Sequence, residues 1–214
     1  MRIAHFGHSC VLVELNGVKV LFDPGTFAHG FEGITGLDAI AITHQHPDHI
    51  DPARIEALVE ANPGARLLSD PQTAQQRGEG WEAVHAGNIV NVGDLQITGG
   101  GGRHAVIHPD IPVIDNTVFQ LGSAADPAQF VHPGDSLWVP PVPVGVLAIP
   151  AAAPWMKLSE TVDYLRAVSP RTALPIHYGV IAPEAQGIYF GRLTEMRPEG
   201  TEFTTVEPET QRDI

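Results

Sequence analysis

His44-Gln45-His46-Pro47-Asp48-His49 gathers four potential metal ligands into six consecutive residues. In an extended or turning segment, residues 44 and 46 point to the same side, so both imidazoles can bind one metal ion. Asp48 and His49 then turn toward a second ion. Without a metal, four such groups would repel one another and lose hydration for no gain. The run therefore predicts a metal site rather than a polar turn with incidental histidines.

The types of ligand indicate the metal and its chemistry. Cys10 is the only cysteine, which excludes an internal disulfide and a thiolate-rich zinc site. Imidazole and carboxylate together suit zinc, manganese or iron. Two adjacent ions can hold a hydroxide nucleophile, because coordination lowers the pKa of water to about 7. We expect two divalent metal ions, zinc first with manganese or iron as alternatives, and Asp48 as a catalytic group that helps to transfer the proton.

Length and charge exclude several classes of function. The 214 residues suit one domain over residues 1–214. With 12 basic and 25 acidic residues the formal net charge is −13, which disfavours a nucleic-acid partner. No apolar run reaches the 18 residues expected of a membrane span, so we expect no membrane partner and a cytoplasmic protein. A small-molecule substrate is expected, and a homo-oligomer is compatible with the sequence.

The sequence around the motif predicts strands followed by a helix. Val11–Leu15 and Val18–Phe22 are separated by Asn16-Gly17, which is typical of an antiparallel hairpin. Residues 37–43 form an apolar run of strand length that leads directly into His44. Asp51 then offers a helix cap before Pro52, and an apolar stripe ends at Asn62-Pro63-Gly64. We expect a helix of about three turns after the motif.

The second half repeats the order of strand, ligand loop and helix. Residues 99–102 are four consecutive glycines, which predict either a flexible loop or backbone that passes close to the metals. A helix is expected over Leu158–Val168, with Ser159 as a possible cap. The remaining predicted strands are two short pieces between Val84 and Ile97, then 117–121, 129–132, 144–149, 173–176 and a weaker closing strand at 202–206.

Further residues along the chain resemble the metallo-β-lactamase superfamily. They are His104 after the glycines, Asp135 in Gly134-Asp135-Ser136, His177 in Pro175-Ile176-His177-Tyr178, and Asp23 in Leu21-Phe22-Asp23-Pro24. The resemblance implies one metal bound by His44, His46 and His104. It implies a second metal bound by Asp48, His49 and His177, with Asp135 as a bridge between the two. Asp23 would support the metal loop through an outer contact.

Within that superfamily, one branch is most similar to this chain. Phe6-Gly7-His8-Ser9, Asp23-Pro24 and the segment around His177 resemble the branch that contains ascorbate-6-phosphate lactonase and N-acyl phosphatidylethanolamine-hydrolysing phospholipase D. Ser136 departs from the threonine that often follows the aspartate. The resemblance spans residues 1 to about 180 and implies an α+β fold, an αβ/βα sandwich of two mixed sheets with outer helices and metals at one edge. We see no long insertion that would form a lid.

These observations favour hydrolysis of a small ester, lactone or phosphodiester. A non-catalytic metal or small-ligand sensor on the same fold is the alternative from another class, and a redox enzyme that uses iron is a second. His8, His108 and Tyr178 are candidate substrate contacts. A hydrogen-bonded structural role for His8 and simple exposure of His108 are equally supported, whereas packing is favoured for Tyr178 and Trp155. Ordinary core or surface roles are expected for His5, His29, His85 and His132.

Overall fold

Two seven-stranded mixed sheets pack face to face in the computed structural model, which describes residues 1–207 and 210–214. The strand order is β14-β1-β2-β3-β4-β5-β6 in the first sheet and β13-β12-β11-β10-β9-β8-β7 in the second. In each sheet an antiparallel half is followed by a parallel half, with β3, β4, β5 and β6 parallel in one and β10, β11, β12 and β13 parallel in the other. This confirms the predicted sandwich.

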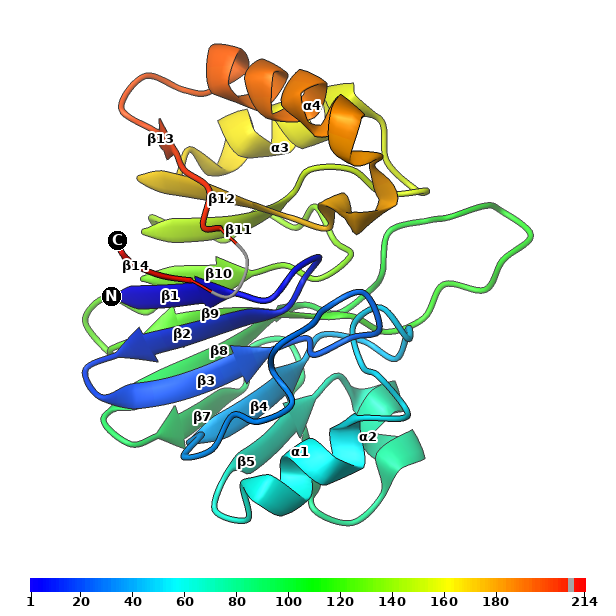
Figure 1. The fold of residues 1–214 in the computed structure, drawn as a ribbon, viewed down its shortest axis with the longest axis vertical. Helices are drawn as coiled ribbons and strands as arrows, with labels where there is room; N and C mark the ends of the chain where they lie inside the picture. The colour runs from blue at the N-terminus through cyan, green and yellow to red at the C-terminus, as the bar shows by residue number, and fades with distance from the viewer. Residues whose placement is uncertain (208–209) are drawn as a thin grey trace.

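The first sheet is formed mainly by the N-terminal half of the chain. Its strands are β1 (Arg2–His5), β2 (Val11–Leu15), β3 (Val18–Phe22), β4 (Ala39–Ile42), β5 (Arg66–Ser69), β6 (Trp81–Ala83) and β14 (Gln211–Asp213). The C-terminal strand β14 pairs with β1, so the two termini lie side by side (Figure 1).

The second sheet is formed by the rest of the chain. Its strands are β7 (Ile89–Val92), β8 (Leu95–Gly101), β9 (Thr117–Gly122), β10 (Phe130–His132), β11 (Val146–Pro150), β12 (Thr172–Ile176) and β13 (Glu202–Phe203). Strands β9, β11 and β12 are buried at every position. Such strands carry no polar alternation because both of their faces are covered.

Helices cover the outer faces of both sheets. They are α1 (Ile55–Ala61) and α2 (Pro71–Arg77) beside the first sheet, and α3 (Leu158–Val168) and α4 (Pro183–Met196) beside the second, with a short 3₁₀ turn at Tyr178–Val180. Figure 1 shows the two helix pairs at opposite sides of the sandwich. None of these helices has the length and apolar character needed to cross a membrane, within the part of the chain that the structure describes.

The core between the sheets holds the fold together. Phe22 of the first sheet packs against Phe119 and Phe130 of the second, with ring centroids 6.2 and 5.3 Å apart. All three are completely buried. Burial of each such side chain contributes about 1.5–3 kcal/mol relative to exposure. The apolar residues predicted for the strands therefore fix the distance between the sheets, and with it the distance between the loops at the strand ends.

The elements predicted around the motif are largely confirmed. Strands β2 and β3 form the expected hairpin, with Leu15 paired to Val18 across the turn. Strand β4 delivers the chain into the His44 run, and the closing strand is present but is limited to Glu202–Phe203. Three elements with weak sequence signals were not predicted. Helix α4 contains Gly187 and Gly191, which weaken its helical pattern, and strands β5 and β6 are short.

One predicted helix start, that of α1, and one predicted cap, Ser159 of α3, were wrong. Helix α1 begins at Ile55 rather than Pro52 and has seven residues. Asp51 instead accepts hydrogen bonds from the Ala53 amide (2.8 Å) and the Arg54 side chain (2.5 Å), which forms a separate turn. Helix α3 begins at Leu158, before Ser159, because the Glu160 carboxylate accepts from the Lys157 amide at 2.6 Å.

The glycine stretch is neither a flexible loop nor a simple lining of the metal site. Gly99, Gly100 and Gly101 belong to strand β8. A Cβ at Gly99 would overlap the carbonyl oxygen of His85, and one at Gly100 would meet the Trp138 ring at about 2.5 Å. The glycines are needed because other parts of the chain lie directly on this strand.

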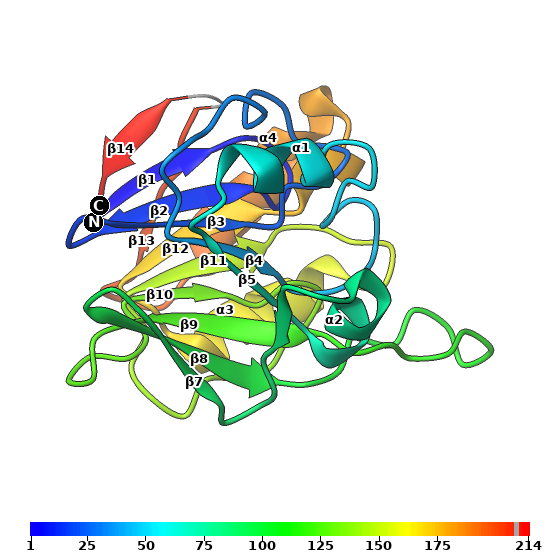
Figure 2. The same cartoon turned by 90° about the horizontal axis from the view of Figure 1, so that it is seen from below.

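The segment between β8 and β9, residues 102–116, was also not expected. It projects well beyond the body of the sandwich in two perpendicular views, as the green loop in Figures 1 and 2. No signal in the sequence predicted this projection. The loop carries His104 at its start.

Gly99→Ala tests this packing. We expect the free energy of unfolding to fall by about 1–3 kcal/mol, because the new methyl group must displace the His85 backbone. Gly33→Ala is the matched control, since no atom lies within 4 Å of its added Cβ, and should change stability by less than about 0.5 kcal/mol. Urea denaturation measures both. Equal stabilities would contradict the close approach.

Candidate metal centre

The predicted ligands converge where strands of both sheets end. Asp23, His44 and the rest of the motif follow β3 and β4 of the first sheet, whereas His104, Asp135 and His177 follow β8, β10 and β12 of the second. Each lies within a few residues of the carboxyl end of its strand. Loops at strand ends are held by a rigid scaffold, so side chains distant in sequence can be placed accurately.

One group contains His44, His46, His104 and Asp135, whose ligand atoms all lie within 4.8 Å of one another. His44 Nε2 is 3.0 Å from His46 Nδ1, and His104 Nε2 is 3.2 Å from Asp135 Oδ2. Zinc bonds of about 2.0–2.2 Å separate tetrahedral ligand atoms by roughly 3.3 Å. The spacing therefore fits a single ion surrounded by these atoms.

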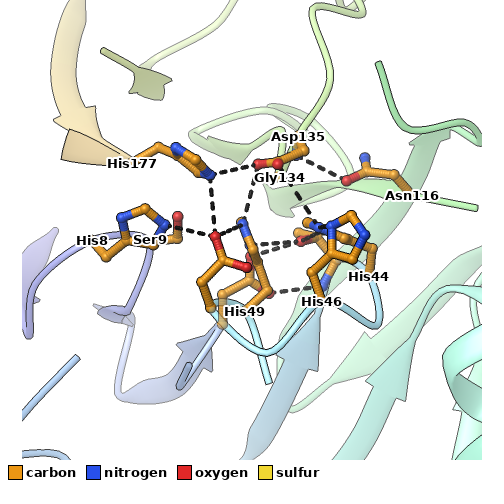
Figure 3. Close-up of polar contacts among 12 residues, drawn as sticks. His8, Ser9, His44, His46, His49, Asn116, Gly134, Asp135 and His177 are labelled. Atoms are coloured by element: carbon orange, nitrogen blue, oxygen red, sulfur yellow. Dashed lines mark hydrogen bonds and ion pairs between the residues drawn. The ribbon is translucent and has the colours of Figure 1, made fainter. Parts of the chain in front are cut away.

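A second group contains His8, Asp48, His49 and His177, again within 4.8 Å. Asp48 Oδ2 lies 3.5 Å from His177 Nε2 and 3.8 Å from His49 Nε2. His8 Nε2 is 3.1 Å from the same oxygen. Figure 3 shows His8 and His177 on one side of Asp135, with His44 and His46 on the other.

Asp135 lies between the two groups. Its Oδ1 is 3.1 Å from His49 Nε2 and 3.2 Å from His177 Nε2, while its Oδ2 faces His104 Nε2 at 3.2 Å. One carboxylate thus presents one oxygen to each group of histidines. This is the geometry that a bridging ligand between two cations requires.

The hydrogen bonds at the outer ring nitrogens fix which nitrogen faces inward. His49 Nδ1 lies 2.6 Å from Asp23 Oδ2, His104 Nδ1 lies 2.5 Å from the Ala105 carbonyl, and His177 Nδ1 lies 2.7 Å from the Ala152 carbonyl. These oxygens can only accept, so each Nδ1 carries the proton and donates it. The Nε2 lone pair of each neutral ring then faces the centre of the site, as metal-binding histidines require.

A bound cation would account for four buried atoms that otherwise lack partners. Nε2 of His49, His104 and His177 and Oδ1 of Asp135 are buried without a hydrogen-bond partner among the described residues. Unpaired buried polar atoms are costly, on the order of 1–3 kcal/mol each. The residues present therefore fit a divalent metal, and the donor set of imidazole and carboxylate suits zinc, manganese or iron.

Electrostatics also favour a cation here. Burial lowers the pKa of His44 and His46, which keeps both rings neutral. Against the lowering effect of burial, the charge of Asp135 raises the pKa of His49 well above its usual value and that of His177 to about 9. Because metal ligands must be deprotonated, binding of a cation would release any such protons.

Asp23 holds the motif in place. Its Oδ1 accepts from the Thr43 amide at 2.7 Å, and its Oδ2 accepts from the Thr43 hydroxyl and His49 Nδ1, both at 2.6 Å. The Thr43 oxygen is 3.1 Å from His44 Nδ1 and can accept its proton. Gly25 lies against the motif so closely that a Cβ there would overlap the Asp48 backbone. The loop after β3 thus orients ligands of both groups.

The family is shown by sequence comparison. A model described as a β-lactamase superfamily domain matches residues 2–177. The chain belongs to the metallo-β-lactamase superfamily. Over 210 residues, 98% of each chain, it is 58% identical to protein Rv0786c of Mycobacterium tuberculosis. It is 26% identical over 204 residues to a UPF0173 metal-dependent hydrolase of Salinibacter ruber, covering 86% of this chain and 87% of the relative.

Among solved structures, this member of the superfamily resembles a metallo hydrolase from the archaeon Ignicoccus hospitalis. The TM-score is 0.74 at 19% identity, with 100% of this chain and 98% of the other covered. This similarity supports the fold. The family and its relatives identify the chain as a metal-dependent hydrolase, whereas the finer resemblance to one branch stays a prediction.

The three candidate substrate contacts of this hydrolase have different surroundings. His8 is buried, and its Nδ1 accepts from the Gly179 amide at 3.2 Å, so the neutral ring donates its Nε2 proton to Asp48. His108 is exposed on the 102–116 loop, near Asp110. Tyr178 contacts His5, with its hydroxyl 3.1 Å from His5 Nδ1. His108 and Tyr178 lie outside the lining of the pocket over the metal groups.

Trp155 and Asn116 were not singled out from the sequence as contacts of the metal-binding residues. Trp155 Nε1 donates to Asp135 Oδ2 at 2.7 Å, and its side chain lines the pocket, although packing was the favoured interpretation. Asn116 Oδ1 accepts from the Asp135 amide at 2.9 Å (Figure 3). Neither residue has a local sequence signal, because both reach Asp135 from distant segments.

Asp23→Asn tests the support of the metal loop. The amide nitrogen cannot accept from both His49 and the Thr43 hydroxyl, so we expect zinc affinity to fall by about 10–100-fold. Competition with a chelating dye measures this. Asp38→Asn is the control, because among the described residues the Asp38 carboxylate accepts only from the Lys19 amide, in an exposed hydrogen bond far from the ligand groups. Unchanged affinity in Asp23→Asn would contradict the role of Asp23.

Proposed function

We propose that this protein hydrolyses a small ester, lactone or phosphodiester with two divalent metal ions, zinc being the first candidate. His44, His46 and His104 would bind one ion, and Asp48, His49 and His177 the other. Asp135 would bind both. The observation that carries the proposal is that Asp135 presents one carboxylate oxygen to each group of histidines.

A metal pair of this kind, when bound, supplies hydroxide at neutral pH and polarises the reacting oxygen of the substrate. The protein's own residues orient the side chains that would bind the metals. Asp23 and the Ala105 and Ala152 carbonyls fix three histidine rings, and Trp155 donates to Asp135 Oδ2, the oxygen that faces His104. His8 holds Asp48 by donating to its Oδ2.

Asp48 is better supported as a ligand than as the proton shuttle expected from the sequence. Burial acts to raise its pKa, but the His177 ring 3.5 Å away and the hydrogen bond from His8 hold that pKa well below its usual range. A general base works best when its pKa lies near the operating pH. The geometry and charge around Asp48 thus favour an ionised ligand that stays deprotonated.

An accessible pocket supports an enzyme over a closed, purely structural metal site. A pocket of about 470 Å³ opens onto His46, Asp48, His104, Asp135 and His177, from both groups. Its size lies within the range of small-molecule sites. Structural metal sites are closed, whereas catalytic sites keep an open position for water or substrate. This access favours turnover of a small molecule.

His46→Ala tests the metal-dependent hydrolysis. Protein stripped of metal and refilled with zinc should bind close to two ions per chain, and the variant should lose about one of them. Hydrolysis of a panel of esters, lactones and phosphodiesters should fall to the level of metal-free protein. Metal analysis and initial rates are the measurements.

His85→Ala is the matched control, since His85 is exposed and belongs to neither ligand group. It should retain metal content and activity. Hydrolysis that survives metal removal would overturn the proposal. Full metal binding without turnover of any substrate in the panel would favour the sensor.

A further inference from the structure

We propose that the substrate carries an apolar chain or ring beside its reacting ester, lactone or phosphodiester group, and no phosphate outside that group. This inference rests on the proposed function and names the substrate class for the same pocket. It comes from the walls of the pocket rather than from the metal ligands at its floor.

The walls are apolar and come from five separate segments. The apolar lining residues are Phe27 after β3, Pro47 in the motif, Ile107 on the 102–116 loop, Pro154 and Trp155 after β11, and Val180 in the turn after β12. The polar groups in the pocket, apart from Thr26, belong to the two ligand groups. A reacting polar centre would therefore meet the floor while the rest of the substrate contacts hydrocarbon.

Exposed apolar side chains concentrate around the same opening. Phe27 is 49% exposed, Val180 43% and Ile107 38%. Val106 and Ile111, which are 57% and 46% exposed, lie on the same projecting loop as Ile107. Five of the nine exposed large apolar residues in the described chain are thus in the lining or on this loop. Clustered exposed apolar surface marks a site of binding, unlike isolated residues.

The pocket offers no cationic side chain to a phosphate outside the reacting group. Neither lysine nor arginine is among its lining residues in the described chain. Arg103, at the base of the loop, has a side chain that is 69% exposed and lies 4.0 Å from Asp115. Arg54 is engaged by Asp51 and Glu32. Sites that recognise a phosphate use arginine or lysine to pair with it.

This wall chemistry does not suit a substrate with a second charged group. Ascorbate-6-phosphate lactonase acts on a phosphorylated lactone, as its name states, whereas this pocket presents apolar walls where a second charged group would have to lie. The pocket volume of about 470 Å³ leaves room for several methylene groups beside the reacting centre.

Chain length is the direct test. With zinc-loaded protein, kcat/KM should rise by about fourfold per methylene between acetate and longer p-nitrophenyl esters, until the pocket is filled. The γ-lactones from butyrolactone to decalactone should follow the same trend. A flat or falling trend, or a preference for a phosphorylated lactone, would overturn the proposal.

Phe27→Ser and Val180→Ser should lower the ratio of kcat/KM for octanoate to that for acetate, mainly through KM. Ile188→Ser is the control, because Ile188 is 64% exposed on α4 and is not part of the pocket lining. Its ratio should equal that of the unmodified chain. If Ile188→Ser lowers the ratio as much as Phe27→Ser, the apolar wall of the pocket does not select the acyl chain of the substrate.

Calorimetry on the metal-free protein separates this inference from the proposed function. γ-Decalactone should bind more tightly than γ-butyrolactone even when no turnover is possible. Chain-dependent binding without metal-dependent hydrolysis would reject the function and keep the pocket's preference. Hydrolysis without any dependence on chain length would keep the proposed function and reject the pocket's preference for an apolar chain.

Discussion

The close approach of His49 Nε2 to Asp135 Oδ1, 3.1 Å across the junction of the two sheets, is the constraint on which the site depends. His49 belongs to the loop after β4 in the first sheet, and Asp135 to the loop after β10 in the second. Both side chains are buried, so the contact exists only if the sandwich is closed to the correct spacing. A divalent cation beside these atoms would satisfy both and would link the sheets at their loop edge.

The aromatic core and the candidate metal centre are connected, because the same strands carry residues of both. Phe22 contacts Phe119 and Phe130 and also lies parallel to the His132 ring, 5.5 Å between centroids. The next residue along the chain is Asp23, which holds His49. His132, in turn, contacts the Ser9 carbonyl at 2.8 Å. The packing that stabilises the fold thereby sets the positions of the residues that orient the ligands.

The floor and the walls of the pocket differ in how deeply their residues are buried. The floor consists of buried histidines and carboxylates whose outer atoms are hydrogen-bonded, so it is rigid and fits a small divalent cation. The walls consist of partly exposed apolar residues on loops, which tolerate change more easily than the floor. A family that shares the floor can therefore act on different substrates, and in this chain the loop between β8 and β9 contributes Ile107 to the walls.

The sequence by itself determined the residue types of the candidate centre and the class of fold. Four potential ligands, three histidines and one aspartate, occur within six residues after a short apolar strand, and strong local signals such as Asn16-Gly17 specify the hairpin beside them. Only the tertiary structure decided which atoms face each other. The tautomers of the histidines, the contact of Trp155 with Asp135 and the apolar wall all join residues far apart in the chain. Such contacts have no local sequence pattern, because they arise when the two sheets pack and bring their loops together.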